Sequence, residues 1–257
     1  MKKKLFGLAA AIALGAFVGT AQAEEVLRIG VEGAYPPFSE KTASGEVVGF
    51  DIDIAKALCA EMGRKCVMVE QDWDGMIPAL RAKKFDAIIA SMSITEERKK
   101  KVDFTNKYYN TPARFVARAD ADFKPTPEGL KGKVVGVQRG TIHQCYMEKH
   151  FPDVKLNLYD TQDAVNLDLV AGRIDAVLAD AIALDDGFLK TERGKGFAFL
   201  GGDQIDPQCF GEGAGIAVRK GDDKLREAFN KAIAAIRANG TYKKINDKYF
   251  AFDIYGD

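Results

Sequence analysis

A run of hydroxyl side chains that ends in an arginine is the part of the chain best suited to binding an anion. Ser91, Ser93 and Thr95 precede Glu97 and Arg98. Hydroxyls, backbone N–H groups and a guanidinium together suit a carboxylate, because arginine holds a carboxylate with two charge-assisted hydrogen bonds. The same run is also typical of a helix start, with Thr95 as N-cap and Arg98 as a solvated charge. The two interpretations are compatible.

Four other side chains could bind the remaining groups of a zwitterion. Asp180 ends an apolar strand, where its carboxylate could bind an ammonium group, although capping or solvation would also explain it. Tyr35 lies in a Tyr-Pro-Pro-Phe loop and Trp73 is the only tryptophan. Such rings can sandwich an aliphatic or cationic side chain, but more often they pack in a core. Glu32 could neutralise a distal positive group, against the common case of an exposed glutamate.

These residues share a position in the expected elements, because each lies at the end of a strand. Ligands of open parallel sheets bind beyond the carboxyl ends of the strands. The segments placed there are 32–35, 71–73, 91–93, 138–142 (with Gln138 and Ile142) and Asp180. Together they offer anion donors, carboxylates and aromatic faces, which match a zwitterion.

The elements that must position these residues form an approximate internal repeat. The first half predicts a strand at 27–31, a helix from about 51, a strand at 65–69, a helix at about 73–83 and a strand at 85–90. The second half predicts a strand at 134–137, a helix reaching 150, a strand at 156–159, a helix from 161 to 172 and a strand at 174–179. Alternating strands and helices imply parallel sheets covered by helices. The expected fold is therefore α/β, with two lobes that each contain a mostly parallel sheet flanked by helices.

The remaining chain, from Gly215 onward, predicts a strand and one long helix. The helix has an apolar stripe of Leu225, Phe229, Ile233 and Ile236, and Asn239-Gly240 is expected to end it. This piece is too small for a domain and must complete one of the lobes, by expectation the first. The chain would then cross between the lobes near 111–117 and again near 211–215, which makes a two-segment hinge. The expected division is 24–112 and 213–257 for the first lobe, and 113–212 for the second.

Residues 1–23 have the pattern of a secretory signal peptide. A basic start, an apolar run at 5–18 and Ala21-Gln22-Ala23 follow in the required order. A membrane anchor is the alternative, but spanning takes roughly 20 apolar residues. The segment contains three lysines and no acid, so the rest of the chain has 34 basic and 37 acidic residues and a net charge of −3. Nothing in that balance suggests nucleic acid or an anionic membrane as a partner, and the apolar fraction of 47% excludes disorder.

Four cysteines lie in the exported part of the chain, and an even number there indicates disulfides, because the compartment is oxidising. Cys59 and Cys66 flank a plausible turn and are expected to pair, which leaves Cys145 with Cys209. No C-x-x-C occurs, and the two histidines are seven residues apart, too far for paired ligation on one helical turn. No dinucleotide, phosphate or zinc-protease motif occurs either. No metal or cofactor is expected.

Over essentially its whole mature length, the chain resembles the periplasmic polar-amino-acid-binding proteins of ABC importers (solute-binding protein family 3). It looks closest to the lysine/arginine/ornithine, histidine and arginine/ornithine binders. The stretches that carry the resemblance are 49–53, 86–95 with Glu97-Arg98, 103–105, 171–176 and 239–250. The resemblance implies a type II periplasmic-binding-protein fold and a monomer in the periplasm. Such a protein binds an amino acid between two closing lobes and delivers it to a membrane permease.

The resemblance also implies roles for the residues that would bind the backbone of the ligand. Arg98 matches the arginine that clamps the α-carboxylate, helped by Ser93 and by backbone N–H groups around Ile142. Asp180 matches the aspartate that receives the α-ammonium group, with Ser91 nearby.

The ligand side chain would be held by a different set of residues. Tyr35 and Trp73 match the aromatic pair that sandwiches its methylenes, and Glu32 lies where the basic-amino-acid binders place an acid near the distal charge. The pairing of Cys59 with Cys66 matches a disulfide of that subfamily.

The chain departs from the family pattern at the loop 138–143, where Gln138 replaces a usual leucine, and at Cys145 and Cys209. Parts of it, 32–35 and 72–75, resemble the opine binders. The expected ligand is thus a cationic amino acid, arginine, ornithine, lysine or histidine, with an opine as the alternative. Cyclohexadienyl dehydratases share the fold, but the zwitterion clamp is intact and no further acid stands out as catalytic. A binding protein is expected rather than an enzyme.

Overall fold

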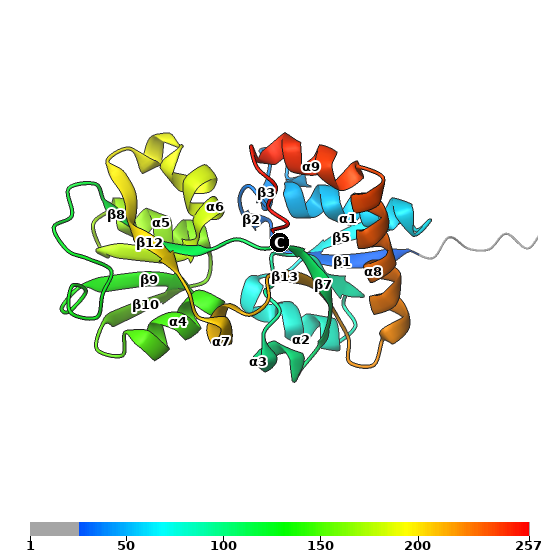
Figure 1. The fold of residues 1–257 in the computed structure, drawn as a ribbon, viewed down its shortest axis with the longest axis horizontal. Helices are drawn as coiled ribbons and strands as arrows, with labels where there is room; N and C mark the ends of the chain where they lie inside the picture. The colour runs from blue at the N-terminus through cyan, green and yellow to red at the C-terminus, as the bar shows by residue number, and fades with distance from the viewer. Residues whose placement is uncertain (1–25, 257) are drawn as a thin grey trace, which may run out of the picture.

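The computed structural model describes residues 26–256, and the expected signal peptide lies outside the described residues. Two five-stranded sheets, each covered by helices, form two lobes that lie side by side (Figure 1). The strand order is β5-β1-β6-β13-β7 in lobe 1 and β10-β9-β11-β8-β12 in lobe 2. The expected two-lobed α/β fold is therefore confirmed.

Lobe 1 has helices on both faces of its sheet. Its strands are β1 (Leu27–Val31), β5 (Cys66–Glu70), β6 (Ala87–Ile88), β7 (Asp103–Tyr109) and β13 (Ala214–Val218). Helices α1 (Phe50–Glu61), α8 (Asp223–Ala238) and α9 (Thr241–Tyr249) pack on one face, while α2 (Met76–Arg81) and α3 (Glu96–Lys99) lie on the other. A small sheet of β2 (Ala34–Tyr35), β3 (Ser39–Lys41) and β4 (Val47–Val48) borders the cleft between the lobes.

Lobe 2 repeats this plan. Its strands are β8 (Ala113–Arg118), β9 (Val134–Gln138), β10 (Lys155–Tyr159), β11 (Ala176–Asp180) and β12 (Phe197–Gln204). Helices α4 (Ile142–His150) and α7 (Pro207–Phe210) lie on one face, while α5 (Gln162–Val170) and α6 (Ala181–Leu184) lie on the other. Short helical turns at 185–189 and 192–194 follow α6.

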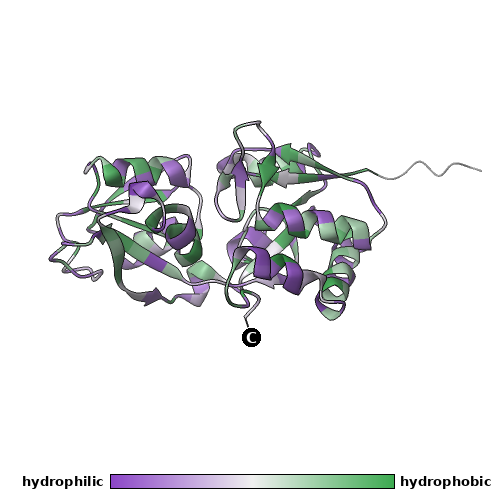
Figure 2. Cartoon of the chain, turned by 90° about the horizontal axis from the view of Figure 1, so that it is seen from above, coloured by the Kyte–Doolittle hydropathy of each residue, from purple (hydrophilic) through white to green (hydrophobic). Residues whose placement is uncertain are grey.

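The core of each lobe forms because apolar side chains recur with the period of the element that carries them. Along α8, the predicted stripe of Leu225, Phe229, Ile233 and Ile236 is buried against the sheet. Fully burying one such side chain contributes about 1.5–3 kcal/mol. Figure 2 shows apolar strands at the centre of the lobes and helices with polar outer faces.

Each sheet is mixed rather than mostly parallel. In lobe 1, β1 pairs in parallel with β5 and β6, but β13 runs antiparallel to β6 and β7. Lobe 2 has the same pattern, with β8 antiparallel to β11 and β12. The antiparallel pairs arise where the chain leaves one lobe and returns to it, because a returning strand enters its sheet from the opposite end.

Three predicted elements differ from the structure. The helix expected at 73–83 begins as a 3₁₀ turn at Trp73–Gly75 and becomes α-helical only from Met76. The strand expected at 85–90 is regular only at Ala87–Ile88, because Ser91 adopts a left-handed conformation with φ of 55°. The C-terminal helix ends at Ala238, as expected, but a second helix, α9, that was not predicted follows Gly240.

Two segments connect the lobes. The first is 110–112, between β7 and β8, and the second is 205–213, between β12 and β13 with α7 inside it. Residues 113–117 and 214–215, which were expected in the crossings, belong to strands instead. We propose lobe boundaries at 24–112 with 213–257 for lobe 1 and 113–212 for lobe 2, which agree with the sheet each strand joins.

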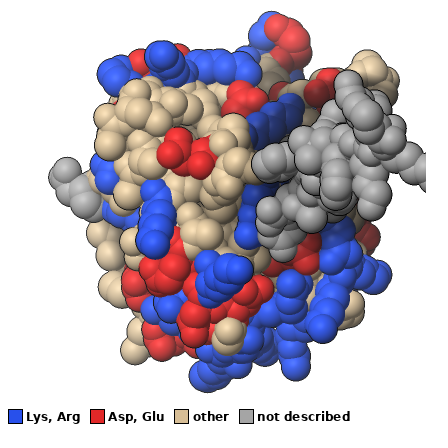
Figure 3. Space-filling model, turned by 90° about the vertical axis from the view of Figure 1, so that its right-hand side faces the viewer, with Lys and Arg blue, Asp and Glu red and all other residues tan. Residues whose placement is uncertain are grey.

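Both expected disulfides are present. Cys59–Cys66 joins α1 to β5 within lobe 1, and Cys145–Cys209 joins α4 to α7. At the end of lobe 1, acidic and basic side chains are interspersed (Figure 3). No helix within 26–256 is long and apolar enough to cross a membrane.

Candidate functional site

All the predicted site residues line one cavity of about 370 Å³ between the lobes. Lobe 1 contributes Glu32, Tyr35, Trp73, Ser91, Ser93 and Arg98, and lobe 2 contributes Gln138, Ile142 and Asp180. All except Arg98, which lies in α3, are at the end of a strand or just beyond it, as expected for ligand sites in open sheets. The structure thus brings the set together, while the role of each residue toward a ligand stays a prediction.

Arg98 is a half-buried cation that has no anionic partner among residues 26–256. Its guanidinium donates to the backbone carbonyl of Ser93 at 3.0 Å and to that of Gly140, across the cleft, at 3.2 Å. Burial lowers the pKa of Arg98 to about 10. Among residues 26–256, no carboxylate forms an ion pair with it. Because both acceptors are neutral carbonyls, Arg98 can still hold a carboxylate.

The start of α4 faces Arg98 from lobe 2. Thr141 caps this helix, accepting from the backbone N–H of Gln144 and donating its hydroxyl proton to the carbonyl of Gln138 at 2.7 Å. The helix begins at Ile142, whose backbone N–H belongs to the first turn, where such groups have no partner within the helix. The positive end of the helix dipole therefore points to the same region as Arg98.

Asp180 is half-buried on lobe 2 and combines a capping role with a carboxylate that faces the cavity. Its Oδ1 accepts from the backbone N–H groups of Ile182 and Ala183 at 2.8 and 3.1 Å, and the Thr111 hydroxyl donates to Oδ2. Burial raises the pKa of Asp180 to about 6, against these hydrogen bonds. Asp180 therefore caps a helix, as the alternative interpretation expected. The cap leaves the negative charge of its carboxylate available to a ligand.

Glu32 and Gln138 meet across the cleft. The Gln138 side-chain amide donates to Glu32 Oε1 at 2.5 Å and to the carbonyl of Asp160 at 3.1 Å. Burial raises the pKa of Glu32 to about 7, and the nearby Asp72 and Asp51 add to the shift. Glu32 is therefore not the exposed glutamate of the common case, and its charge has no cationic partner within 26–256.

Two aromatic rings form walls of the cavity. Tyr35 and Trp73 are both buried and both line it. The Arg98 guanidinium lies 5.2 Å from the centre of the Trp73 ring, within the range of a cation–π contact. Packing in a lobe core therefore explains the position of these rings only in part, because both rings also line the cavity.

Asp51 is an acid near the site that was not predicted from the sequence. It is fully buried in the first turn of α1, and it accepts from the hydroxyls of Ser91 and Tyr108, each at 2.9 Å. Burial raises its pKa to about 7. Through Ser91, it holds the loop after β6 in its left-handed conformation.

His143 lines the cavity and was not predicted as a site residue. It is buried next to Ile142 on α4, and burial lowers its pKa to about 3, aided by the Arg98 charge. Its Nε2 is buried without a hydrogen-bond partner. From the sequence, the histidines were considered only as metal ligands, whereas this one packs against Phe210 of α7 with ring centres 6.3 Å apart.

The charges around the cavity are therefore unbalanced. Two carboxyl groups, Glu32 and Asp180, line the cavity with one guanidinium, Arg98, and neither carboxyl group has a cationic partner in the described chain. Buried charges are costly unless they are paired. The site is electrostatically complementary to a molecule with one carboxylate and two cationic groups.

The comparisons with known proteins agree with this architecture. Residues 27–252 match the family model of bacterial extracellular solute-binding proteins, family 3. The chain is 54% identical to an L-arginine-binding protein of Pseudomonas aeruginosa, over 98% of this chain and 99% of the relative. It is 44% identical, over the full length of both, to the histidine-binding periplasmic protein of Escherichia coli.

Solved structures give the same result. A Salmonella typhimurium periplasmic binding protein described for its high arginine specificity matches with a TM-score of 0.82 and 36% identity, over 88% of this chain and 99% of that one. An ancestral arginine-binding protein bound to arginine matches with a TM-score of 0.81 and 40% identity, over 88% and 98%. These relatives are binding proteins and not enzymes, in agreement with the expectation for this chain. With its two lobes, its interlobe cavity and these matches, the chain belongs to the bacterial extracellular solute-binding proteins of family 3.

Proposed function

We propose that this protein binds a cationic L-amino acid, with arginine preferred, in the periplasm and delivers it as a monomer to the permease of an ABC importer. The observation that carries the proposal is the charge pattern of the cavity, where a guanidinium without an anionic partner faces carboxylates without cationic partners in the described part of the chain. The arginine- and histidine-binding relatives support the ligand class, and the periplasmic name of the histidine binder supports the expected signal peptide. Nucleic acid is not a proposed partner.

The ligand would lie along the cavity with its charges matched one by one. Its α-carboxylate would bind Arg98 and the first backbone N–H groups of α4, and its α-ammonium group would bind Asp180. Its distal guanidinium or ammonium group would meet Glu32, with its methylenes between Tyr35 and Trp73. Hydrogen bonds to charged groups contribute about 1.5–3 kcal/mol each. A ligand that lacks one of the three charges would therefore bind less tightly, which makes the protein selective.

Ligand binding would favour the closed arrangement of the lobes. Arg98 already contacts Gly140 across the cleft, and Glu32 already contacts Gln138. A ligand that touches both lobes adds its contacts only when the lobes are together, so it shifts the population toward the closed form. The closed form is the one we propose to be recognised by the permease.

Calorimetric titration of the mature protein tests the proposal. The panel contains arginine, ornithine, lysine and histidine, with glutamine as the uncharged control and octopine for the opine alternative. We expect the cationic amino acids to bind more tightly than glutamine, because only they place a charge at Glu32. Tighter binding of octopine than of arginine, or no binding to any member, would contradict the proposal.

A further inference from the structure

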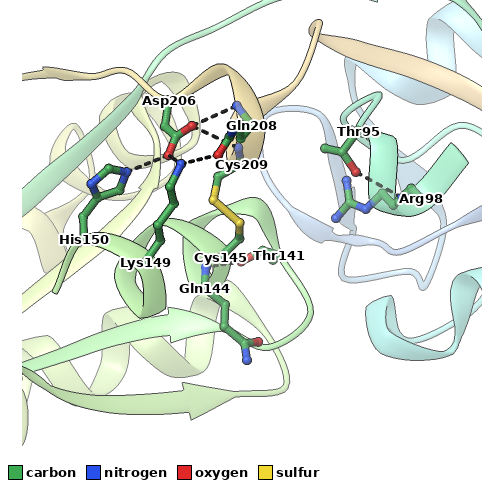
Figure 4. The surroundings of a disulfide bond; sticks show 10 residues. All are labelled: Thr95, Arg98, Thr141, Gln144, Cys145, Lys149, His150, Asp206, Gln208 and Cys209. Atoms are coloured by element: carbon green, nitrogen blue, oxygen red, sulfur yellow. Dashed lines mark hydrogen bonds and ion pairs between the residues drawn. A yellow bond between two sulfur atoms is a disulfide. The ribbon is translucent and has the colours of Figure 1, made fainter. Parts of the chain in front are cut away.

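We propose that the Cys145–Cys209 disulfide, with the contacts around it, positions the carboxylate-binding end of the cavity. The disulfide connects α4, whose first turn faces Arg98, to α7, which lies inside the second crossing between the lobes. We call these contacts between α4 and α7 the α4–α7 joint (Figure 4). The inference rests on the proposed function, since its main readout is amino-acid affinity.

The joint is held at the start of α7 by a shared carboxylate. Asp206 caps α7 by accepting from the backbone N–H groups of Gln208 and Cys209, at 2.8 and 3.3 Å. Its other oxygen accepts from Lys149 Nζ at 2.7 Å and lies 2.6 Å from Nε2 of His150. One buried carboxylate thus ties the first turn of α7 to the last turn of α4.

The joint is held at the end of α7 by the disulfide and by ring packing. Cys209 is bonded to Cys145, and their Cα atoms are 5.6 Å apart. The next residue, Phe210, stacks on Tyr146 with ring centres 4.9 Å apart and packs against His143. Within residues 26–256, His143 Nε2 has no hydrogen-bond partner, so the recorded contact that links this ring to α7 is its packing against Phe210.

Directly after α7, the crossing is fixed to lobe 1. Glu212 donates its backbone N–H to the carbonyl of Ile94 at 3.0 Å, and Ile94 donates to the carbonyl of Gly213 at 2.8 Å. Only Gly211 separates this ladder from Phe210 in the joint. The ladder runs beside Ser93, the residue whose carbonyl accepts from Arg98.

A short, continuous path therefore links the two sides of the carboxylate site. Lobe 1 holds Arg98 and the ladder, and the joint follows within one residue. The loop before α4 presents the Gly140 carbonyl to Arg98, and Ile142, the first residue of α4, lines the same cavity. Without the disulfide, α4 could shift relative to the second crossing. Fewer molecules would then have Arg98 and the start of α4 positioned together for binding a carboxylate. The apparent affinity falls by the fraction of molecules that remain competent to bind.

The second disulfide is a matched control. Cys59–Cys66 joins α1 to β5 inside lobe 1, and neither cysteine lines the cavity. The double variants C145S/C209S and C59S/C66S each remove one disulfide, so a general loss of stability affects both.

The experiment measures arginine affinity and dissociation rate by calorimetry and stopped-flow fluorescence. For C145S/C209S we expect about tenfold weaker binding, mainly through faster dissociation, because a tenth of the molecules would remain in register. For C59S/C66S we expect a change of less than about twofold. Unchanged affinity in folded C145S/C209S, or equal losses in both variants, would overturn the inference.

A second pair of variants keeps the test decisive if C145S/C209S does not fold. Lys149→Met weakens the joint without touching a cysteine, and Lys248→Met removes an ion pair of the same 2.7 Å length, to Asp53, on lobe 1. We expect about two- to threefold weaker arginine binding for K149M and unchanged binding for K248M. The expected loss is small because a partly exposed ion pair contributes little free energy. Equal affinities in K149M and K248M would overturn the inference.

Hydrogen exchange of the ligand-free proteins separates this inference from the proposed function. We expect residues 140–144 to exchange faster in C145S/C209S than in wild type and in C59S/C66S. If wild type binds no amino acid, the proposed function fails, while this exchange result still decides whether the joint holds α4. If wild type binds arginine and the exchange at 140–144 is unchanged, the inference alone fails.

Discussion

Asp180 has two tasks in this structure that a substitution can separate. Its Oδ1 caps α6, and its negative charge is the one we propose for the α-ammonium group of the ligand. Replacement by alanine removes both, whereas asparagine keeps an oxygen that can cap the helix. N-cap residues contribute about 0.5–2 kcal/mol to stability, so the two variants differ in fold stability as well as in charge.

For Asp180→Ala and Asp180→Asn, we expect arginine binding to weaken by a hundredfold or more, since one partner of a buried charge pair is worth about 3–5 kcal/mol. Asp180→Asn should lose less thermal stability than Asp180→Ala. Calorimetry and thermal unfolding check the two effects. Retained affinity in Asp180→Asn would remove this residue from the ligand site.

Glu32 is the residue on which the choice of ligand depends. For Glu32→Gln, we expect about ten- to fiftyfold weaker binding of arginine, from the loss of one charge-assisted hydrogen bond. Citrulline, which lacks the distal charge, should lose much less. Parallel titrations of both ligands measure the difference, and equal losses would contradict the role of Glu32.

At the scale of elements, Gly211 brings the second crossing close to the backbone of lobe 1. Gly211 has φ of 72°, and a Cβ there would lie 2.0 Å from the backbone carbonyl oxygen of Ile94. Gly240, between α8 and α9, has a similar φ of 81°, but a Cβ there would meet nothing within 4 Å. An alanine would therefore have a strained backbone at both positions, but its Cβ would collide with a neighbouring residue only at position 211.

Gly211→Ala should destabilise the protein by more than about 2 kcal/mol, from strain and displacement of the crossing together. Gly240→Ala should cost only about 1 kcal/mol, since strain acts alone there. Urea unfolding of both variants gives the comparison. Similar losses would show that the contact with Ile94 relaxes at little cost.

The same scale shows what the sequence could predict. The α8 stripe was correctly located, because long amphipathic helices carry a strong periodic signal. Gln138 and Asp180 were found because each ends a strand with a clear apolar pattern. The break between Trp73 and Met76 was missed, because a 3₁₀ turn leading into a helix leaves no separate signal in the pattern of apolar residues.

Asp51, near the site, and His143, in the cavity, were missed because they depend on contacts that local patterns do not contain. An acid in the first turn of a helix is normally solvated and favourable there, but Asp51 is buried by Ser91 and Tyr108, 40 and 57 residues later in the chain. His143 packs against Phe210 of α7, which is distant in the chain. Both became visible only when distant segments were placed together.

At the scale of the whole molecule, the two lobes share one electrostatic environment. Glu32 and Asp51 belong to lobe 1 and Asp180 to lobe 2, yet burial raises the pKa of each, to about 7, 7 and 6. In the ligand-free protein, these groups are partly protonated near pH 6.5. A cationic ligand prefers them ionised, so its binding must release protons in that range.

We therefore expect arginine affinity to rise with pH between about 5.5 and 8, with a total change of roughly tenfold or more. Calorimetry in buffers of different ionisation enthalpy should show proton release near pH 6.5 and almost none near pH 8. Glu32→Gln should reduce the number of protons released. An affinity independent of pH over this range would contradict the assignment of these carboxyls to the ligand site.

The position of β13 sets an order of assembly for the newly made chain. This strand is contributed by residues 214–218, yet it lies between β6 and β7 inside the sheet of lobe 1. Lobe 2 is complete once residue 212 has emerged, whereas lobe 1 keeps a gap in its sheet until nearly the whole polypeptide is available. During synthesis from the N-terminus, lobe 1 therefore lacks a central strand of its sheet and stays incompletely folded. Lobe 2 has all its strands earlier and can already fold.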